Sequence, residues 1–330
     1  MKGTTIDGNL EFLRAFLAER KTLKSEQIRK LGGSSASSVY LVGHSIYRVG
    51  PKKEVARDIS CYNAFKSRLQ DYQKIFPAFA ILFDSNGMVI CQIEYIGKRN
   101  LEDMLMGLRL DGKSYRMIES INSSVLKIIK SLFEATKLPK GELSTRSANQ
   151  QFLRELLRAL IANLRLADMA DELNLKKLSR LRTISTKYFQ PSIIHRDLTM
   201  GNIMLRDISH EPRLIDPRHA IPYLNDGYIF GNVAFDLAGY YVSLQRKEMQ
   251  LKRKDLRFNL ASIVELVRSE VDDYIRSGVF DITLFNLCLL VWYSIYSACR
   301  CDYCLANKRK WLYAKMRKKT LELYSELTQL

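Results

Sequence analysis

The stretch that decides the fold is PSIIHRDLTMGNIMLRDISHEPRLIDPR, residues 191–218 of a chain of 330 residues. An apolar run comes shortly before Asp197 and another comes before Asp216, while a third directly follows Asn202. Short apolar runs bounded by turn residues are typical of buried strands. We therefore expect the ends of these strands to bring three oxygen-bearing side chains, two carboxylates and one amide, to one place.

A turn signal divides the second half of this stretch. Residues 207–212, DISHEP, are rich in turn formers, so the flanking runs 203–205 and 213–215 can pair as a β-hairpin. That pairing brings Asn202 and Asp216 to the same end of the hairpin.

Hard oxygen ligands from Asn202 and Asp216 suit Mg²⁺, which keeps several waters and shares the rest of its shell with substrate phosphates. Asp197 then remains free to accept a proton. This constellation resembles the catalytic core of the protein-kinase-like superfamily, whose H-R-D-x-x-x-x-N loop and metal-binding aspartate are matched without a gap by His195, Arg196, Asp197, Asn202 and Asp216. The alternative interpretation is a hairpin whose polar residues merely cap turns.

Composition fits a globular chain of one large or two smaller domains, with 47% hydrophobic and 26% charged residues. Six cysteines accompany an N-terminus that lacks the apolar stretch of a signal peptide, which favours a reducing cytoplasm. The most apolar segment, 284–298, falls short of the roughly 20 residues that cross a membrane, so we expect a core helix and no transmembrane segment. Cys299, Cys301 and Cys304 offer three ligands without a nearby histidine, and we expect no zinc site there.

The formal net charge of +17 indicates a long-range field that attracts anions. Basic residues gather in two C-terminal clusters: Arg246, Lys247, Lys252, Arg253 and Lys254, then Lys308, Arg309, Lys310, Lys315, Arg317, Lys318 and Lys319. Such clusters can bind an anionic partner, namely nucleic acid, an acidic glycan or a membrane surface. They can also be solvated helix faces that keep a basic protein soluble.

A loop of small residues lies far upstream, where backbone amides can approach phosphates closely. It contains Gly32, Gly33 and Ser34 and is followed by strands around residues 39–42 and 45–49. In the aminoglycoside phosphotransferase and choline kinase branch of the superfamily, a loop of the type G-G-x-x-N/S-x-x-x-Y precedes a strand that ends in a cation. The residues that look like members of this pattern are Gly32, Gly33, Ser38, Tyr40 and Arg48.

The resemblance implies that Arg48 clamps the α- and β-phosphates of ATP and that an acidic residue on the next helix, 54–69, holds it in place. Asp58 fits this role best by position, and Glu54 is the alternative. Because arginine departs from the lysine that is usual in the family, Lys52 and Lys53 are rival candidates for the phosphate clamp.

Two further strands, 80–83 and 88–94, are joined by the turn Asp84-Ser85-Asn86-Gly87, a strong hairpin signal. The segment that follows resembles the kinase hinge. The resemblance implies that backbone groups near Glu94 and Ile96 bind the adenine edge of ATP.

Helical spacing over residues 118–133 and 151–173 indicates an insertion between the hinge and the catalytic loop, which in this branch helps to build the acceptor pocket. Beyond the metal aspartate, residues 231–238 resemble the G-D-P-x-x-D-L-A signature of the same branch. Asp236 would then stand at a helix start, where it can cap amides and brace the catalytic loop.

We therefore expect an α+β, two-lobed protein-kinase-like fold. Residues 1–30 form an N-terminal helical extension, 31–97 a nucleotide-binding lobe with a small antiparallel sheet, and 98–330 a mostly helical lobe with the catalytic loop and metal site. The resemblance implies an ATP- and Mg²⁺-dependent phosphotransferase acting on a small-molecule hydroxyl, and the basic charge favours a neutral-to-anionic acceptor such as a sugar or glycan. The alternatives are a protein Ser/Thr kinase, an RNA kinase, and a catalytically silent nucleic-acid-binding module.

Overall fold

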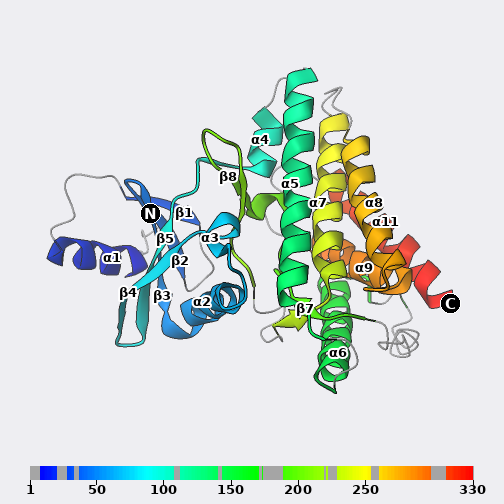
Figure 1. The fold of residues 1–330 in the computed structure, drawn as a ribbon, viewed down its shortest axis with the longest axis horizontal. Coiled ribbons are helices and arrows are strands. Elements are labelled where there is room, and N and C mark those ends of the chain that lie inside the picture. The colour runs from blue at the N-terminus through cyan, green and yellow to red at the C-terminus, as the bar shows by residue number, and fades with distance from the viewer. Residues whose placement is uncertain are drawn as a thin grey trace.

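A computed structural model describes residues 8–20, 28–32, 37–107, 112–139, 143–170, 173, 189–218, 221, 229–253, 260–298 and 310–329. These residues form a small lobe that contains a sheet and a larger lobe of long helices (Figure 1). The chain passes from the small lobe, blue to cyan in the figure, into the large lobe, green to red. This is the α+β, two-lobed architecture that the sequence predicts.

The small lobe is built on a five-stranded antiparallel sheet in the order β1-β2-β3-β5-β4. Its strands are β1 (Arg29–Gly32), β2 (Ser38–Val42), β3 (Ser45–Pro51), β4 (Phe79–Ser85) and β5 (Met88–Glu94). The predicted β4–β5 turn is confirmed, with positive φ at Asn86 (54°) and Gly87 (75°), as a tight hairpin turn requires. Strand β1 was not predicted, because its sequence RKLG has no strand pattern of its own. The structure shows it extended and paired with β2.

Two helices, α1 (Gly8–Glu19) and α2 (Lys52–Lys66), pack with this sheet, and the short α3 (Tyr72–Ile75) follows α2 along the chain. The apolar face of α1, which includes Leu13 and Phe16, shares a buried cluster with Tyr40 and Ile90 of the sheet. The N-terminal helix is therefore part of the small-lobe core.

Seven described helices build the large lobe: α4 (Leu101–Gly107), α5 (Gly112–Thr136), α6 (Leu143–Leu166), α7 (Val233–Arg253), α8 (Ala261–Arg276), α9 (Ile282–Ala298) and α11 (Lys310–Gln329). The most apolar of them, α9, is the core helix that the sequence predicts, and it contacts α6, α7 and α11. Within the ranges given above, the structure contains no helix that is long and apolar enough to cross a membrane.

Two small sheets carry the stretch 191–218. One has the order β6-β8-β9, from β6 (Arg99–Asn100), β8 (Ile203–Leu205) and β9 (Pro212–Leu214). The other pairs β7 (Ser192–Ile193) with β10 (Phe230–Gly231). The predicted hairpin is confirmed as the antiparallel pair β8–β9.

The segment between the lobes is fastened to this hairpin at Gly97. A Cβ atom at Gly97 would lie 2.1 Å from the carbonyl oxygen of Leu205, so the close approach of the two backbones requires glycine. The next amide, of Lys98, donates a hydrogen bond to Asp207 Oδ1 at 2.9 Å. The hairpin and the connection between the lobes therefore share one rigid contact.

The contact between α7 and α9 gives a test of the large-lobe core. Gly239 faces the buried Trp292, and a Cβ atom there would lie 2.6 Å from the indole ring. We expect Gly239→Ala to lower the free energy of unfolding by about 1–3 kcal/mol through overpacking, measured by urea denaturation. The matched control is Gly8→Ala, where nothing lies within 4 Å. Equal unfolding free energies for the two variants would contradict this packing.

Candidate active site

The loop after β7, which the sequence predicts to be the catalytic loop and which we call by that name, has an unfavourable backbone conformation that buried acids hold in place. Arg196 has a φ of 66°, which is costly for a non-glycine residue. The amides of His195 and Arg196 donate to the two carboxylate oxygens of Asp236, at 2.7 and 2.9 Å. The Arg196 guanidinium forms a fully buried ion pair with Glu155 of α6. The predicted bracing of this loop by Asp236 is confirmed, and the loop aims Asp197 as a result.

Glu155 is a partner that the sequence did not reveal. It lies within the uniform helical pattern of α6, and only the fold brings it beneath the catalytic loop. Glu155 also accepts a hydrogen bond from the amide of Ile221 at 3.2 Å. An unpaired buried arginine would be very costly, so this glutamate is needed for Arg196 to be buried at all.

His195 is held as a neutral ring. Burial lowers the pKa of His195 to about 4. Its Nε2 lies 2.9 Å from the carbonyl oxygen of Ile215, and its Nδ1 accepts the amide of Asp197 at 3.4 Å. The tautomer protonated at Nε2 satisfies both contacts, because Nδ1 is then free to accept. His195 therefore links the catalytic loop to the strand end that carries Asp216.

Asp197 lies in a buried setting beside two polar neighbours. Burial raises the pKa of Asp197 to about 6, while the nearby guanidinium of Arg218 opposes the shift. Arg218 Nε lies 2.6 Å from Asp197 Oδ2. The Asn202 side chain donates to the carbonyl oxygen of Asp197 at 2.8 Å, so the loop folds back on itself between these two residues.

Asp216 lies near Arg218, the neighbour of Asp197. Its backbone is in the left-handed conformation, with a φ of 57°. Its amide donates to the hydroxyl of the buried Tyr62 at 2.9 Å. Its carboxylate is 3.2 Å from an Arg48 guanidinium nitrogen and 3.9 Å from Arg218 Nη2. The backbone of the hairpin joins Asn202 to this group, since the Ile215 amide donates to the Asn202 carbonyl at 3.0 Å.

Arg48 of β3 reaches across to the large lobe. It forms ion pairs with Asp58 of α2 and with Asp216, and it donates to Ser37 Oγ at 3.3 Å. Burial raises the pKa of Asp58 to about 6, with Arg48 opposing the shift. Of the rival cations, Lys52 instead pairs with Asp84 at 2.9 Å and Lys53 is exposed. The structure thus brings Arg48 and Asp58, and not Lys52, to Asp216, the predicted metal ligand.

The predicted phosphate loop lies between β1 and β2. Gly32 is the last residue of β1, and Gly33 and Ser34 lie outside the described residues. Ser38 is the buried first residue of β2 and its Oγ accepts a hydrogen bond from Asn9 at 3.4 Å. The neighbouring Ser37, which the sequence did not single out, is the residue that contacts Arg48.

The predicted hinge begins where β5 ends. The Glu94 amide donates to the Ala78 carbonyl at 2.8 Å, and the Glu94 carboxylate accepts the Ala78 amide and pairs with Arg206. The Glu94 amide is therefore already hydrogen-bonded. If adenine binds here as predicted, the Glu94 backbone can offer it only the carbonyl oxygen. Ile96, two residues further on, is buried.

The residues at the site fit Mg²⁺ by their donor chemistry. Asn202 and Asp216 supply an amide oxygen and a carboxylate, and the described residues contain no group of three or more His, Cys, Asp or Glu side chains arranged around a metal. A magnesium ion here would therefore take most of its shell from phosphate and water, as this ion commonly does. Cys299, Cys301 and Cys304 lie outside the described residues.

Several members of the two basic clusters make contacts within the protein. Arg246 and Lys247 pair with Glu102 of α4, at 3.1 and 3.2 Å, and Lys247 is buried. Arg317 donates to the Ala167 carbonyl at 2.9 Å, just after the end of α6. For these residues, holding helices together is a sufficient explanation of the positive charge.

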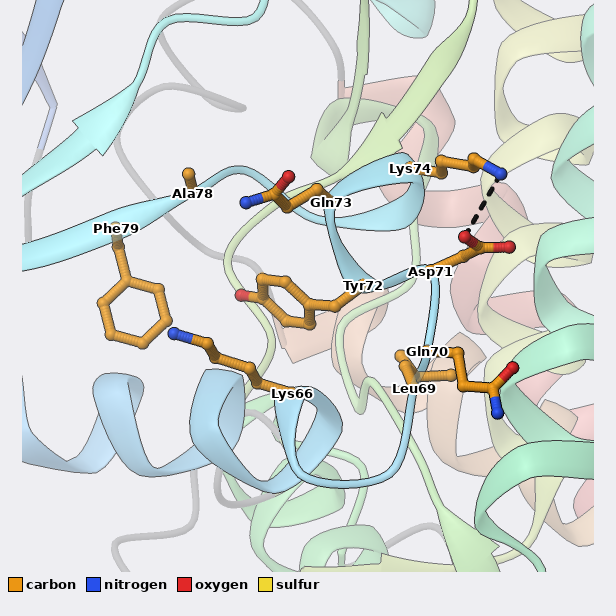
Figure 2. A pocket seen from close by; sticks show the side chains of 9 residues that line it. All are labelled: Lys66, Leu69, Gln70, Asp71, Tyr72, Gln73, Lys74, Ala78 and Phe79. Atoms are coloured by element: carbon orange, nitrogen blue, oxygen red, sulfur yellow. Dashed lines mark ion pairs between the residues drawn. The ribbon is translucent and has the colours of Figure 1, made fainter.

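A cavity of about 500 Å³ lies where the end of α2, α3 and the start of β4 meet (Figure 2). It is lined by Lys66, Leu69, Gln70, Asp71, Tyr72, Gln73, Lys74, Ala78 and Phe79. None of these is a predicted site residue. The ring of Tyr72 stacks on Phe76, which stacks in turn on His195, so the cavity wall and the catalytic loop are two aromatic contacts apart.

Comparison with known proteins identifies the fold. No protein-family model matches the chain, and no curated protein matches it in sequence. Among solved structures, a putative aminoglycoside phosphotransferase from Ralstonia eutropha JMP134 is 13% identical with a TM-score of 0.57, covering 97% of both chains. A thermostable mutant of aminoglycoside phosphotransferase APH(4)-Ia, in ternary complex with ADP and hygromycin B, is 12% identical with a TM-score of 0.55, covering 94% of this chain and 97% of that one.

A glucosamine kinase is 16% identical with a TM-score of 0.50, covering 97% of this chain and 85% of that one. At these identities the likeness concerns the fold. The chain has the two-lobed, protein-kinase-like fold of the aminoglycoside phosphotransferases over almost its whole length.

The neutral state of His195 predicts a pH dependence of stability. The pKa of His195 is about 4 when folded and about 6.5 when unfolded, so the unfolded state binds the extra proton between these values. Stability from this group is complete above pH 6.5 and is lost as the pH falls toward 4, by about 2–3 kcal/mol at pH 4.5.

Buried carboxylates with raised pKa values shift stability the opposite way, so the measurement is the difference between wild type and His195→Asn. We expect the stability advantage of the wild type in urea unfolding to shrink between pH 7.5 and pH 4.5. A difference that stays constant over this range would show that His195 is not buried as a neutral ring.

Proposed function

We propose that the protein is an ATP-dependent phosphotransferase that uses Mg²⁺ to transfer the γ-phosphoryl group to a hydroxyl of a small molecule. The observation that supports it best is the meeting of Asp197, Asn202 and Asp216 with the Arg48–Asp58 pair at one place between the lobes. Proteins of the same fold include aminoglycoside phosphotransferases and a glucosamine kinase, some of them in complex with ADP or GDP.

Each side chain has a role that follows from its surroundings. Asn202 and Asp216 would hold Mg²⁺, which when bound neutralises charge on the nucleotide phosphates. Arg48, fixed by Asp58, would bind phosphate oxygens from the small lobe. Asp197 would orient the acceptor hydroxyl and accept its proton. A pKa near 6 suits this task, because the carboxylate is ionised at neutral pH and is more basic than an ordinary aspartate. Catalysis would then be mainly positioning and charge stabilisation.

The acceptor class follows from charge. A chain with a formal net charge of +17 repels a polycationic aminoglycoside at long range and attracts neutral or anionic molecules more readily. We therefore propose a sugar, a glycan or another neutral-to-anionic hydroxyl compound as the acceptor.

Incubation with γ-labelled ATP and fractionated cell extract tests this function. Label entering the small-molecule fraction supports the proposal. Label entering protein or RNA would instead identify a protein kinase or an RNA kinase. No transfer, together with RNA binding that weakens steeply with salt, would identify a silent nucleic-acid-binding module.

The proposed base gives a first mutational prediction. Asp197→Asn keeps the shape of the side chain but cannot accept a proton, so we expect loss of phosphoryl transfer with nucleotide affinity within about threefold of wild type. Labelled-ATP turnover and calorimetry measure the two quantities. Asp273→Asn, an exposed change on α8, is the matched control. Unchanged turnover in Asp197→Asn would refute the assignment.

The proposed metal ligand gives a second mutational prediction. Asp216→Gly removes the carboxylate while glycine accepts the φ of 57° without strain. We expect Mg²⁺ to tighten ATP binding to the wild type and to have no such effect on the variant. Calorimetry with and without Mg²⁺ decides the matter, and an equal metal effect in both proteins would exclude Asp216 as a ligand.

A further inference from the structure

The side chain of Arg218 bridges the two aspartates of the site. Its Nε lies 2.6 Å from Asp197 Oδ2, and its Nη2 lies 3.9 Å from Asp216 Oδ2. The Arg218 amide donates to the carbonyl oxygen of His195 at 2.9 Å, so its backbone is fastened to the catalytic loop. One guanidinium therefore spans the gap between the proposed base and the proposed metal ligand.

Positive charge next to Asp197 comes from outside the loop that carries this residue. The loop from Asp197 to Asn202 reads DLTMGN and contains no cation of its own. Arg48 lies on the small-lobe side of Asp216, where it is held by Asp58 and Ser37. Arg218 is thus a cation that the large lobe supplies next to Asp197.

Phosphoryl transfer needs positive charge in this position. The transition state spreads negative charge over the three equatorial oxygens of the moving group, between the leaving nucleotide and the attacking hydroxyl. An arginine suits these oxygens because its planar fork donates several hydrogen bonds and stays charged. The Arg218 side chain is 47% exposed. Its guanidinium can therefore turn from the carboxylates to a substrate, because it is not enclosed in a buried pocket.

We propose that Arg218 is a catalytic cation for the transferring phosphoryl group, an inference that rests on the proposed function. In the resting site it pairs with Asp197 and screens the repulsion between Asp197 and Asp216. With nucleotide and acceptor bound, its guanidinium donates to oxygens of the moving phosphoryl group. The acceptor oxygen forms a bond to the γ-phosphorus as the bond to the β–γ bridging oxygen breaks. The hydroxyl proton goes to Asp197, and Arg218 keeps its protons throughout.

The test compares ground-state and transition-state binding in Arg218→Ala. We expect labelled-ATP turnover to fall on the order of 10³-fold, as for an arginine that stabilises this transition state. Affinity for Mg²⁺ with a non-hydrolysable ATP analogue should stay within about threefold, whereas affinity for Mg²⁺·ADP with aluminium fluoride should fall about 100-fold or more. Added guanidinium ion should restore part of the turnover. Arg218→Lys keeps the charge but not the fork, and its turnover should lie between those of Arg218→Ala and wild type.

Arg276→Ala, which removes an exposed arginine of α8, is the matched control and should behave as wild type in every assay. Wild-type binding of the aluminium fluoride complex by Arg218→Ala would overturn the inference and leave the proposed function intact. Loss of turnover without weaker binding of that complex and without guanidinium rescue would also overturn it, since Arg218 would then only position Asp197. A wild-type protein that binds no Mg²⁺-nucleotide would instead remove the proposed function and this inference together.

Discussion

The two hydrogen bonds from the amides of His195 and Arg196 to Asp236 hold the one backbone turn on which the site depends. Arg196 has a positive φ and is completely buried, and such a conformation costs about 1–3 kcal/mol unless its surroundings enforce it. Asp236 satisfies the backbone and Glu155 satisfies the guanidinium, so α7 and α6 together impose the turn. The orientation of Asp197 depends on that turn, and so does the hydrogen bond from the Asn202 side chain to the Asp197 carbonyl.

The small lobe is linked to this arrangement through one face of α2. Asp58 and Tyr62 lie four residues apart and therefore on the same side of the helix. Asp58 holds Arg48, and the Tyr62 hydroxyl accepts the amide of Asp216. A movement of α2 would thus change the proposed phosphate clamp and the proposed metal ligand at once. The network of Arg48, Arg218 and three aspartates compensates charges that would otherwise repel one another in a partly buried space.

Short sequence patterns correctly predicted those strands, turns and helices whose formation depends on residues close together in the chain. The β4–β5 turn follows from Asn86 and Gly87, the β8–β9 hairpin from apolar runs around a turn, and the core helix α9 from its composition. Strand β1 was missed because its four residues carry no strand pattern. The basic clusters suggested an anionic partner, yet Arg246, Lys247 and Arg317 make contacts inside the large lobe that no charge count could reveal.

The sequence by itself predicted the candidate site's principal side chains, Asp197, Asn202 and Asp216, because they lie on one short stretch of chain and Asn202 and Asp216 flank the β8–β9 hairpin. It also offered Arg48 and Asp58 as a pair, but with Lys52, Lys53 and Glu54 as rivals. Only the tertiary structure shows that Arg48 pairs with Asp58 and Asp216, and only it revealed Glu155, Tyr62 and Arg218 as partners. The physical reason is that a buried or bridging charge is defined by what surrounds it in space, and those surroundings come from helices and strands far apart in the chain.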